Sequence, residues 1–411
     1  MKYGLLGEKL SHSFSKEIHE QIGDYTYDLL EVAPNCLEDF FKKRDFSAIN
    51  VTIPYKECAI AYLDEIDAAS AQIGAINTVL NRGGKLYGYN TDFLGLRLML
   101  KNSGIQIEGK KVLILGSGGT SKTAYAVAKD GGAREILRVS RKKTDGCITY
   151  SEAVSHTDTQ VIINTTPCGM YPNIDDCPID ITCFPALSGV ADVIYNPLRS
   201  RLVLAAQERG INATGGLYML VAQAVFAAEF FKNKKLPCGT IDEVFEKLYK
   251  SKLNIVLTGM AGCGKSTIGK ALSDELSMNF IDTDDLIVKR IGCSIKEFFE
   301  TCGEAAFRDV ETEVIKECAA LSHTVIATGG GAVLRAENIT ALKQNGMIYY
   351  LDRPLDTILP TETRPLSSNR EDLSRRFLER EPIYKSTCDR HIKIGSQLDE
   401  NVKTIKKDYT L

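Results

Sequence analysis

The sequence predicts an α/β protein whose doubly wound, parallel sheets belong to two successive regions of the chain. From residue 109 onward, short apolar strands alternate with glycine turns and amphipathic helices. This pattern is typical of a parallel sheet with helices on both faces. Two of these strands run into glycine-rich loops, at residues 116–119 and 259–266. A chain of 411 residues is also too long for a single hydrophobic core.

The first region is expected to begin with short strands separated by helix-like stretches. The start of the chain reads as a strand that enters a turn at Gly7. Further strands are predicted at residues 51–53, 78–80, 112–115, 136–139, 161–164 and 190–194. Residues 217–231 are mostly apolar and are predicted to form a buried helix. Gln223 and Glu229 interrupt this apolar stretch, so no membrane span is expected.

A second region is expected to begin near residue 250. A short connector at residues 236–239 and a charged helix that ends near Lys252 come before a new strand, Asn254–Thr258. We therefore predict one unit of residues 1–249 and another of residues 250–411.

Composition excludes several functional classes. The formal charge of −3 provides no basic field for nucleic acid or an anionic membrane. The twelve cysteines form no C-x-x-C pair and no zinc-type cluster, so free thiols and a cytoplasmic location are expected. The predicted partners are therefore small molecules, without nucleic acid or membrane.

The first glycine loop has the composition of a dinucleotide site. Gly116, Gly118 and Gly119 follow the apolar strand Lys111–Leu115, and small residues there let backbone N–H groups approach a pyrophosphate at a helix N-terminus. Ser121 stands where the fingerprint has its third glycine. A tight β–α turn without a ligand is the alternative interpretation.

The end of the following strand bears on the choice of cofactor. An NAD site usually has an acidic residue there, which bonds the ribose diol. This chain has Ser140, Arg141, Lys142 and Lys143 instead. A hydroxyl beside cations suits a 2′-phosphate and favours NADP(H), although an ordinary solvated run of charges is also compatible with these residues.

The first region resembles the shikimate dehydrogenases over nearly its whole length. The motifs that carry the resemblance are S-H-S-F-S at 11–15, N-V-T-I-P-Y-K-E at 50–57, G-A-I-N-T at 74–78, G-Y-N-T-D at 88–92, N-T-T-P-x-G-M at 164–170 and D-x-x-Y-N-P at 192–197. The resemblance implies NADPH-dependent reduction of 3-dehydroshikimate to shikimate. It also implies a substrate lobe of residues 1–98 plus 225–249, and a Rossmann-like NADP lobe of residues 99–224.

By this resemblance, Lys56 and Asp92 form the catalytic pair. Hydride delivered to a carbonyl leaves alkoxide character on the oxygen, which a lysine can stabilise or protonate while a carboxylate orients the lysine. Taken alone, Lys56 reads as an exposed lysine and Asp92 as a helix N-cap. Lys16 departs from the family, which commonly has proline at this position.

The resemblance also assigns the remaining residues of this site. The substrate-binding residues are Ser13, Ser15 and Thr52 for the carboxylate, Asn77, Asp92 and Gln223 for the ring hydroxyls, and Tyr195, which closes the site, together with Lys56. The cofactor residues are Gly116, Gly118, Gly119, Thr120, Ser140, Arg141, Lys142, Val193, Gly216 and Met219.

The second glycine loop, residues 259–266, satisfies G-x-x-x-x-G-K-[ST] in full. It lies between a strand and an apparent helix at residues 267–276, as a phosphate-binding P-loop requires. Lys265 is expected to bridge the β- and γ-phosphates of ATP, and Ser266 to bind Mg²⁺. A plain glycine-rich turn is the alternative. The expected ATP-binding residues are Gly262, Cys263, Gly264, Lys265, Ser266, Thr267 and Arg364.

Two carboxylates, Asp282 and Asp284, follow the next predicted strand, and their spacing places them on one side of an extended segment. Three further motifs and a glycine triplet follow in order. They are G-E-x-x-F-R-x-x-E at 303–311, G-G-G at 329–331, R-P-L at 364–366 and R-x-P-x-Y at 380–384. With the P-loop, this series resembles the shikimate kinases across about residues 252–411. It implies transfer of the γ-phosphoryl group of ATP to the 3-hydroxyl of shikimate.

The residue types suit an anionic polyol as the acceptor. Arg308 and Arg380 can fork onto its carboxylate. Asp284 would orient or deprotonate the acceptor hydroxyl, and Asp282 would act on Mg²⁺, partly through water. By the resemblance, Glu311 fixes the rotamer of Arg308, Gly329, Gly330 and Gly331 let the backbone approach shikimate, and Arg364 belongs to a lid.

Simpler interpretations of these residues exist. Arg308 and Glu311 could be a surface pair, Asp282 a helix cap and the glycine triplet a flexible loop. The predicted lid, residues 357–363, is short and lacks a second arginine, so slow turnover or weak ATP binding is expected.

Two alternatives to a bifunctional shikimate enzyme remain open. Either half could prefer another polyol acid, such as quinate in the first half or a gluconate-like acid in the second. One half could also be a binding module without catalysis.

Overall fold

The computed structural model describes residues 2–10, 13–143, 146–358 and 370–410. The chain divides into two compact units, Met1–Tyr249 and Lys250–Leu411. The division falls within helix α9 (Thr240–Lys252). Within the described part of the chain, no helix is both long enough and apolar enough to cross a membrane.

The first sheet of the N-terminal unit is mixed. Its order is β2-β1-β3-β5-β6-β4, with β1 parallel to β2 and β3, and β5 antiparallel to β3 and β6. The strands are β1 (Tyr3–Gly7), β2 (Tyr27–Glu31), β3 (Ala48–Val51), β4 (Glu65–Ile66), β5 (Thr78–Arg82) and β6 (Lys85–Tyr89). Helices α1 (Ser15–Ile22), α2 (Leu37–Lys43) and α3 (Ala68–Ile73) lie between them along the chain.

The predicted strand at residues 51–53 has the wrong bounds. Strand β3 ends at Val51, and the chain then turns, with Tyr55 N donating to Thr52 O at 2.9 Å. Pro54 has no N–H for a ladder, and the Ile53 side chain is exposed, so neither residue supports continuation of the strand. This turn, rather than a strand, carries Lys56.

The second sheet of the N-terminal unit is parallel throughout. Its order is β12-β11-β10-β7-β8-β9. The strands are β7 (Lys111–Leu115), β8 (Glu135–Ser140), β9 (Ile148–Thr149), β10 (Val161–Asn164), β11 (Gly189–Asp192) and β12 (Asn212–Thr214). If β7 is taken as the first strand, this order is that of a Rossmann fold. The direction in which successive strands are added to the sheet changes between β7 and β10. The predicted Rossmann-like fold is confirmed, although β11 ends two residues before the predicted Ile194.

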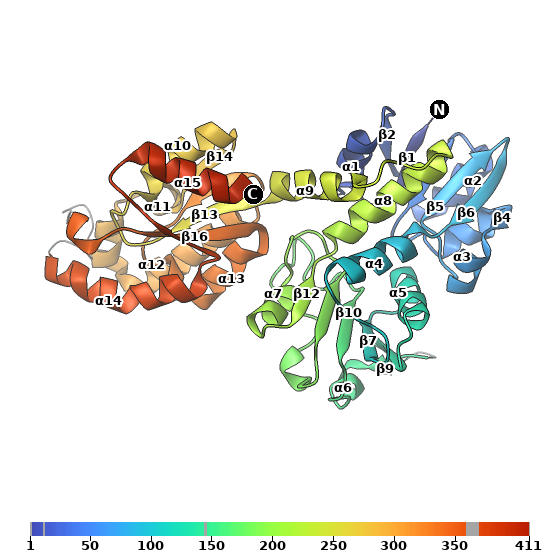
Figure 1. Ribbon diagram of the computed structural model, residues 1–411, viewed down its shortest axis with the longest axis horizontal. Coiled ribbons are helices and arrows are strands. Elements are labelled where there is room, and N and C mark those ends of the chain that lie inside the picture. Colours follow the sequence, from blue (N-terminus) through green and yellow to red (C-terminus); the bar gives the residue numbers. More distant parts are fainter. Residues whose placement is uncertain (1, 11–12, 144–145, 359–369, 411) are drawn as a thin grey trace. The chain divides into compact units, whose positions relative to one another are not determined.

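Two long helices connect these sheets. Helices α4 (Thr91–Asn102) and α8 (Leu217–Lys232) pack along each other (Figure 1), and α8 is the predicted buried helix. Both predicted lobe boundaries therefore fall inside helices. Helices α5 (Gly119–Asp130), α6 (Tyr150–Ala153) and α7 (Arg201–Glu208) belong to the second sheet's layers.

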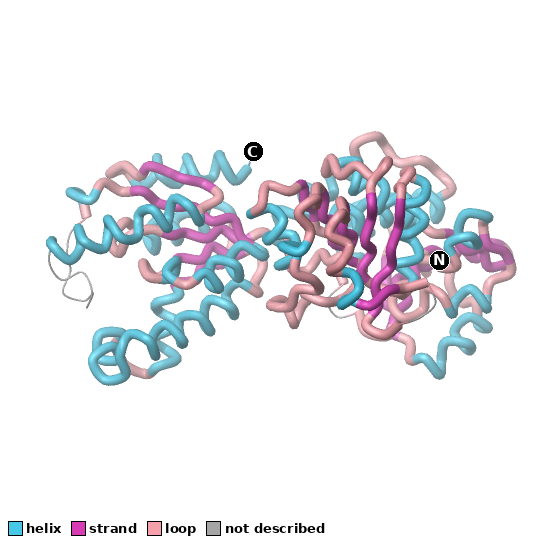
Figure 2. The backbone as a smooth tube through the Cα atoms, turned by 90° about the horizontal axis from the view of Figure 1, so that it is seen from below, coloured by secondary structure: helices cyan, strands magenta, loops and turns pink. Residues whose placement is uncertain are grey.

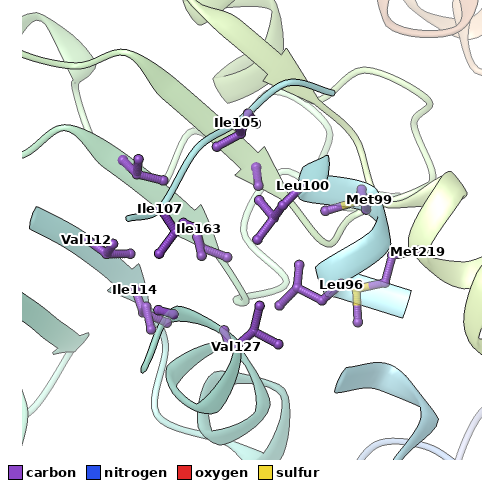
Figure 3. Packing of buried hydrophobic residues seen from close by; sticks show 14 of the residues in the cluster. Leu96, Met99, Leu100, Ile105, Ile107, Val112, Ile114, Val127, Ile163 and Met219 are labelled. Carbon is purple, nitrogen blue, oxygen red and sulfur yellow. The ribbon is translucent and has the colours of Figure 1, made fainter. Parts of the chain in front are cut away.

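An apolar core joins α4 and α8 to the parallel sheet. Figure 3 shows side chains of both helices directed at the faces of β7 and β10. Its members include Leu96, Met99 and Leu100 of α4, Met219 of α8, Val112 and Ile114 of β7, and Ile163 of β10. Because Met219 is anchored in this core, the end of α8 that carries it is fixed relative to the sheet.

The C-terminal unit contains one parallel sheet of order β14-β15-β13-β16-β17. The strands are β13 (Asn254–Thr258), β14 (Asn279–Asp282), β15 (Thr324–Ala327), β16 (Gly346–Asp352) and β17 (Arg390–Lys393). Helices lie on both faces (Figure 2). They are α10 (Lys265–Leu276), α11 (Thr283–Ile291), α12 (Ile295–Ala319), α13 (Ala336–Asn345), α14 (Arg370–Thr387) and α15 (Leu398–Thr410). The loops after all five strands therefore share one edge, in the order of the strands.

Candidate active sites

A cavity of about 530 Å³ lies in the N-terminal unit at the carboxyl ends of β10 and β11. Loops of the mixed sheet contribute Thr52, Lys56 and Asn77 to its wall, and Val193 and Tyr195 follow β11. Ligands of open α/β sheets bind in such a crevice. The residues predicted for substrate binding, 13, 15, 52, 56, 77, 92, 195 and 223, all line it.

A lysine–carboxylate pair forms part of the wall of this cavity. Lys56 Nζ donates to Asp92 Oδ2 at 2.7 Å and to Thr120 Oγ1 at 3.4 Å. The two charged side chains are only 15% and 7% exposed, so Lys56 is not a solvated surface lysine. Asp92 is not the cap of α4 either, because Asn90 fills that position and accepts a hydrogen bond from Phe93 N. The pair presents an ammonium donor beside the first turn of α5.

An amide network forms the wall beside this pair. Asn77 Nδ2 donates to Gln223 Oε1 at 3.1 Å and to Thr91 Oγ1 at 3.0 Å, and Thr91 N donates to Asn77 Oδ1 at 2.7 Å. These contacts join the mixed sheet, α4 and α8. Thr91 was not among the predicted site residues, although it lies in the G-Y-N-T-D motif.

Hydroxyl groups of Ser13, Ser15 and Tyr195 form another part of the cavity wall. Ser13 Oγ lies 3.1 Å from Ser15 Oγ, and Ser15 N donates to Ser13 Oγ at 3.2 Å. Tyr195 is hydrogen-bonded to Ser13, which lowers its pKa, but the larger effect of desolvation raises the pKa of Tyr195 overall. Tyr195 is therefore a neutral phenol. Lys16 lies within α1 with its side chain half-exposed, 3.8 Å from Glu20.

The glycine loop after β7 lies close to the residues that follow the neighbouring strand β10. Gly116 has a φ of 119°, and a Cβ there would lie 2.5 Å from Thr165 Oγ1, so glycine is required. A Cβ on Gly118 would meet nothing within 4 Å, which leaves open space before the N-terminus of α5. An NADP pyrophosphate fits such a cradle. Thr120, Val193, Gly216 and Met219 line the neighbouring cavity, and Gly119 begins α5.

The predicted 2′-phosphate residues lie at the end of β8. Gly116 N donates to Val139 O at 2.8 Å, which places Ser140 next to the glycine loop. Arg141 and Lys142 are exposed and are not among the residues that line the cavity. This arrangement suits either a phosphate ligand or a solvated run of charges.

Asp192 was not among the predicted site residues. Its carboxylate links the end of β10 to the segment that follows β11. Its Oδ1 accepts from Asn164 Nδ2 and Ile194 N, both at 3.0 Å, and its Oδ2 accepts from Ser200 Oγ at 2.6 Å. Burial raises the pKa of Asp192 to about 7. The signal was its place at the head of D-x-x-Y-N-P, but its partners become apparent only in the fold.

The C-terminal unit has a cavity of about 340 Å³ around the P-loop. Lys265 Nζ donates to Gly259 O at 2.8 Å and Met260 O at 2.9 Å, so the loop is wrapped around the ammonium group. Helix α10 begins at Lys265, two residues before the predicted start. Of the predicted ATP-binding residues, 262, 264, 265, 266 and 267 line the cavity, while Cys263 is buried beside it.

A hydroxyl and a carboxylate meet in this cavity. Ser266 Oγ donates to Asp282 Oδ2 at 2.5 Å. Hard oxygen ligands of this kind suit Mg²⁺, which usually takes one or two carboxylates plus substrate phosphates and water. Across the described residues, no cluster of three His, Cys, Asp or Glu side chains could hold a metal by itself.

The predicted extended arrangement of Asp282 and Asp284 is wrong. The chain turns into α11 directly after Asp282, whose Oδ1 caps the helix by accepting from Asp284 N at 3.0 Å. Asp284 is thus in the first helical turn. Desolvation, followed by the negative charge of Asp282, raises the pKa of Asp284 to about 6, against the opposing effect of Lys265.

A buried arginine of α12 is paired with two glutamates of the same helix. Arg308 Nη1 donates to Glu311 Oε2 at 2.7 Å and Nη2 to Glu304 Oε1 at 3.0 Å. The side chains of Arg308 and Glu311 are 9% and 1% exposed, which rules out an ordinary surface pair.

The glycine triplet packs directly against this charged group. A Cβ on Gly331 would lie 2.3 Å from Arg308 Nη1, and one on Gly329 would lie 2.6 Å from Asp284 Oδ1. Arg380 Nη1 donates to Gly330 O at 3.1 Å. The triplet therefore connects the predicted acceptor residues. Gly330 lines the P-loop cavity, whereas Arg308 and Arg380 are not among the residues that line it.

Two further points concern the predicted ATP site. Arg364 and most of the predicted lid lie outside the described residues. Arg353, which sequence reasoning did not single out, lines the cavity from the end of β16. Its position directly after the apolar strand β16 was the feature of the sequence that could have indicated a role at the site.

Comparison with known proteins matches both regions of the chain to known families. The family model for the shikimate dehydrogenase substrate binding domain matches residues 5–79. A shikimate dehydrogenase (NADP(+)) of Clostridium perfringens is 35% identical over 264 residues, which cover 60% of this chain and 97% of that protein. The chain belongs to the shikimate dehydrogenase family.

Solved structures agree over the same region. Shikimate dehydrogenase 1 from Peptoclostridium difficile has 35% identity and a TM-score of 0.57, covering 60% of this chain and 98% of that one. The Thermus thermophilus shikimate 5-dehydrogenase, solved in complex with NADP(H) and shikimate, has 26% identity and a TM-score of 0.54, covering 60% and 99%.

The remaining region matches a second family. The shikimate kinase family model covers residues 261–410. The chain is therefore a bifunctional enzyme of the shikimate pathway, in which an NADP-type oxidoreductase is joined to an ATP-dependent phosphotransferase.

Proposed function

We propose that the N-terminal unit reduces 3-dehydroshikimate to shikimate, with Lys56 and Asp92 as the catalytic pair. The observation that carries this proposal is the 2.7 Å contact between Lys56 Nζ and Asp92 Oδ2 inside the cavity, beside Thr120 of the cofactor helix. Asn77 and Gln223 stand next to this pair as donors and acceptors for ring hydroxyls.

When bound, NADPH supplies the hydride to the carbonyl carbon. Lys56 donates a hydrogen bond and then a proton to the carbonyl oxygen as negative charge develops on it. Asp92 holds the ammonium group in place. The hydroxyls of Ser13, Ser15 and Thr52 bind the substrate carboxylate, and the neutral Tyr195 closes over it. Gly116, Gly118 and Gly119 would hold the pyrophosphate, with Ser140, Arg141 and Lys142 at the 2′-phosphate.

We propose that the C-terminal unit phosphorylates the 3-hydroxyl of shikimate. Asp284 is the acceptor-side base, and its raised pKa is matched to taking a proton from the hydroxyl as the bond to phosphorus forms. Arg308 and Arg380 bind the shikimate carboxylate beside Gly329, Gly330 and Gly331. Lys265 holds the β- and γ-phosphates, and Ser266 and Asp282 would hold Mg²⁺, partly through water, which would neutralise phosphate charge.

These roles imply a division of labour along the chain. We assign the dehydrogenase to residues 1–249, with the substrate lobe at 1–98 and 225–249 and the NADP lobe at 99–224, and the kinase to residues 250–411. The two compact units support this assignment. The twelve cysteines, none in a disulfide, favour the cytoplasm.

A coupled assay tests both activities together. Purified protein receives 3-dehydroshikimate, NADPH, ATP and Mg²⁺, while absorbance follows NADPH and chromatography resolves the products. NADPH oxidation with accumulation of shikimate 3-phosphate is expected. Oxidation that stops at shikimate contradicts the kinase proposal, and no oxidation with either NADPH or NADH contradicts the dehydrogenase proposal. Quinate and gluconate serve as competing substrates that reveal another specificity.

A further inference from the structure

Arg353 is a cation at the P-loop cavity that has no assigned role. It follows β16 directly, and β16 runs parallel to β13 with Tyr350 beside Thr258. The start of the P-loop rests on this strand, because a Cβ on Gly259 would lie 2.8 Å from Leu351 O. Arg353 then reaches across the loop, so that its Nη1 lies 3.8 Å from the position of a Cβ on Gly264.

The guanidinium group of Arg353 has few protein partners. Within the described parts of the chain, Arg353 Nη2 donates to Gly395 O at 3.2 Å, and no carboxylate lies within ion-pair distance of the guanidinium group. By contrast, Arg308, Arg335 and Arg390 are each paired with carboxylates. A guanidinium group carries several N–H donors in a planar fork, so most of those of Arg353 remain for a ligand in the cavity.

The order of loops along the sheet edge shows which part of a nucleotide Arg353 can reach. Asp284 directly follows β14 and the glycine triplet directly follows β15, whereas the P-loop follows β13 and Arg353 follows β16 on the far side. A γ-phosphoryl group transferred toward Asp284 must face the β14–β15 side. The α-phosphate and the nucleoside therefore extend toward β16.

We propose that Arg353 binds the section of the phosphate chain that ATP and ADP have in common, on the side of the P-loop opposite the acceptor. Forked donation to phosphate oxygens gives this contact strength and orientation. Arg353 thereby places a positive charge at the end of β16, in addition to the single arginine of the predicted lid. This inference rests on the proposed kinase activity for its direction along the nucleotide.

Calorimetry on the full-length chain tests the contact. Arg353→Ala is titrated with Mg·ADP and with a non-hydrolysable Mg·ATP analogue. Because the contact is to phosphates that both ligands possess, both dissociation constants are expected to rise by about 10- to 100-fold, the usual worth of a charge-assisted hydrogen bond. Arg353→Lys keeps the charge without the fork and should recover part of the loss. Arg390→Ala is the matched control. Arg390 is the first residue of β17, at the end of the strand away from the P-loop cavity, and it pairs with Asp408 of α15.

Steady-state kinetics give a second readout. KM for ATP should rise in Arg353→Ala while kcat and KM for shikimate stay near their original values, the pattern of a contact made equally in ground and transition states. NADPH oxidation by the same preparation should be unchanged, which reports an intact N-terminal unit.

The outcomes separate this inference from the proposed function. Unchanged affinity for both nucleotides overturns the inference. Weakened binding of the ATP analogue alone also overturns it, because the contact would then be to the γ-phosphate. If ADP binding weakens as expected but shikimate is not phosphorylated by the unaltered enzyme, the nucleotide contact stands and the proposed acceptor fails.

Discussion

The two candidate catalytic carboxylates occupy the same local position but have different surroundings. Asp92 is the second residue of α4, which Asn90 caps, and Asp284 is the second residue of α11, which Asp282 caps. Each carboxylate therefore experiences the same favourable end of a helix dipole. Asp92 lies 2.7 Å from an ammonium group, whereas the neighbour that caps α11 is itself a carboxylate.

This difference shows that the nearest side chains, rather than the backbone position, determine what a carboxylate can do. In the proposed reaction, Asp92 positions the ammonium group of Lys56 beside the carbonyl oxygen, where negative charge develops. Beside Asp282 and partly desolvated, Asp284 has a raised pKa and is suited to accepting a proton from a hydroxyl. Three predictions test this comparison, and a fourth tests the cofactor loop of the unit that contains Asp92.

Replacing Asp284 should have the largest effect. In Asp284→Asn, kcat for shikimate phosphorylation should fall by about 10²- to 10⁴-fold, because the acceptor-side base is lost. Dehydrogenase activity should be unchanged. Asp285→Asn removes the same charge from the exposed neighbour and serves as the control. Equal losses in both variants would mean that the effect comes from net charge rather than from base catalysis.

Replacing Asp92 should have a smaller effect. In Asp92→Asn, kcat for 3-dehydroshikimate reduction should fall by about a hundredfold, the lower end of the range for general acid–base catalysis, because Lys56 remains as the direct donor. Kinase activity should not change. Asp130→Asn, at the far end of α5, is the control for loss of a surface carboxylate. An unaltered kcat would show that Lys56 needs no partner.

The pH dependence of the kinase should reveal the raised pKa of Asp284. A base with a pKa of about 6 is increasingly protonated below that pH, so kcat/KM should decline as pH falls through 6 and should level off above it. Asp282→Asn removes one cause of the shift, and the decline should then move to lower pH even though the remaining activity is low. A pH profile in which Asp282→Asn leaves the midpoint in place contradicts this explanation.

The smallest effect is expected at the cofactor loop. Gly118→Ala adds a methyl group to the open space before α5, so KM for NADPH should rise by about tenfold as a backbone approach to phosphate is blocked. The melting temperature should not change, because no protein atom lies within 4 Å of the added Cβ. An unchanged KM would place the pyrophosphate elsewhere.

The sequence predicted most reliably what is encoded in contiguous segments. The P-loop between β13 and α10, the glycine turn between β7 and α5, and the α/β class of both units follow from local rules for strands, glycines and helix starts. The predicted fold is confirmed by the strand orders of both parallel sheets.

The remaining features depend on the ends of strands and on distant contacts. Residues 51–53 continue an apolar pattern, yet Pro54 and the turn at Tyr55 end the strand. Asp282 could be read as the end of a strand or as a cap, and only the turn into α11 decides between them. The role of Asp192 depends on Asn164 and Ser200, which local periodicity cannot place beside it.

The closeness of Gly331 to Arg308 also constrains how this gene can change. Every amino-acid substitution of a glycine codon adds a Cβ, and any Cβ at this position would fall 2.3 Å from the guanidinium nitrogen. Only synonymous changes of the Gly331 codon therefore leave Arg308 in place. In a saturation library selected for growth without aromatic supplements, position 331 should retain glycine alone, while Gly118 should accept a few small residues at reduced fitness.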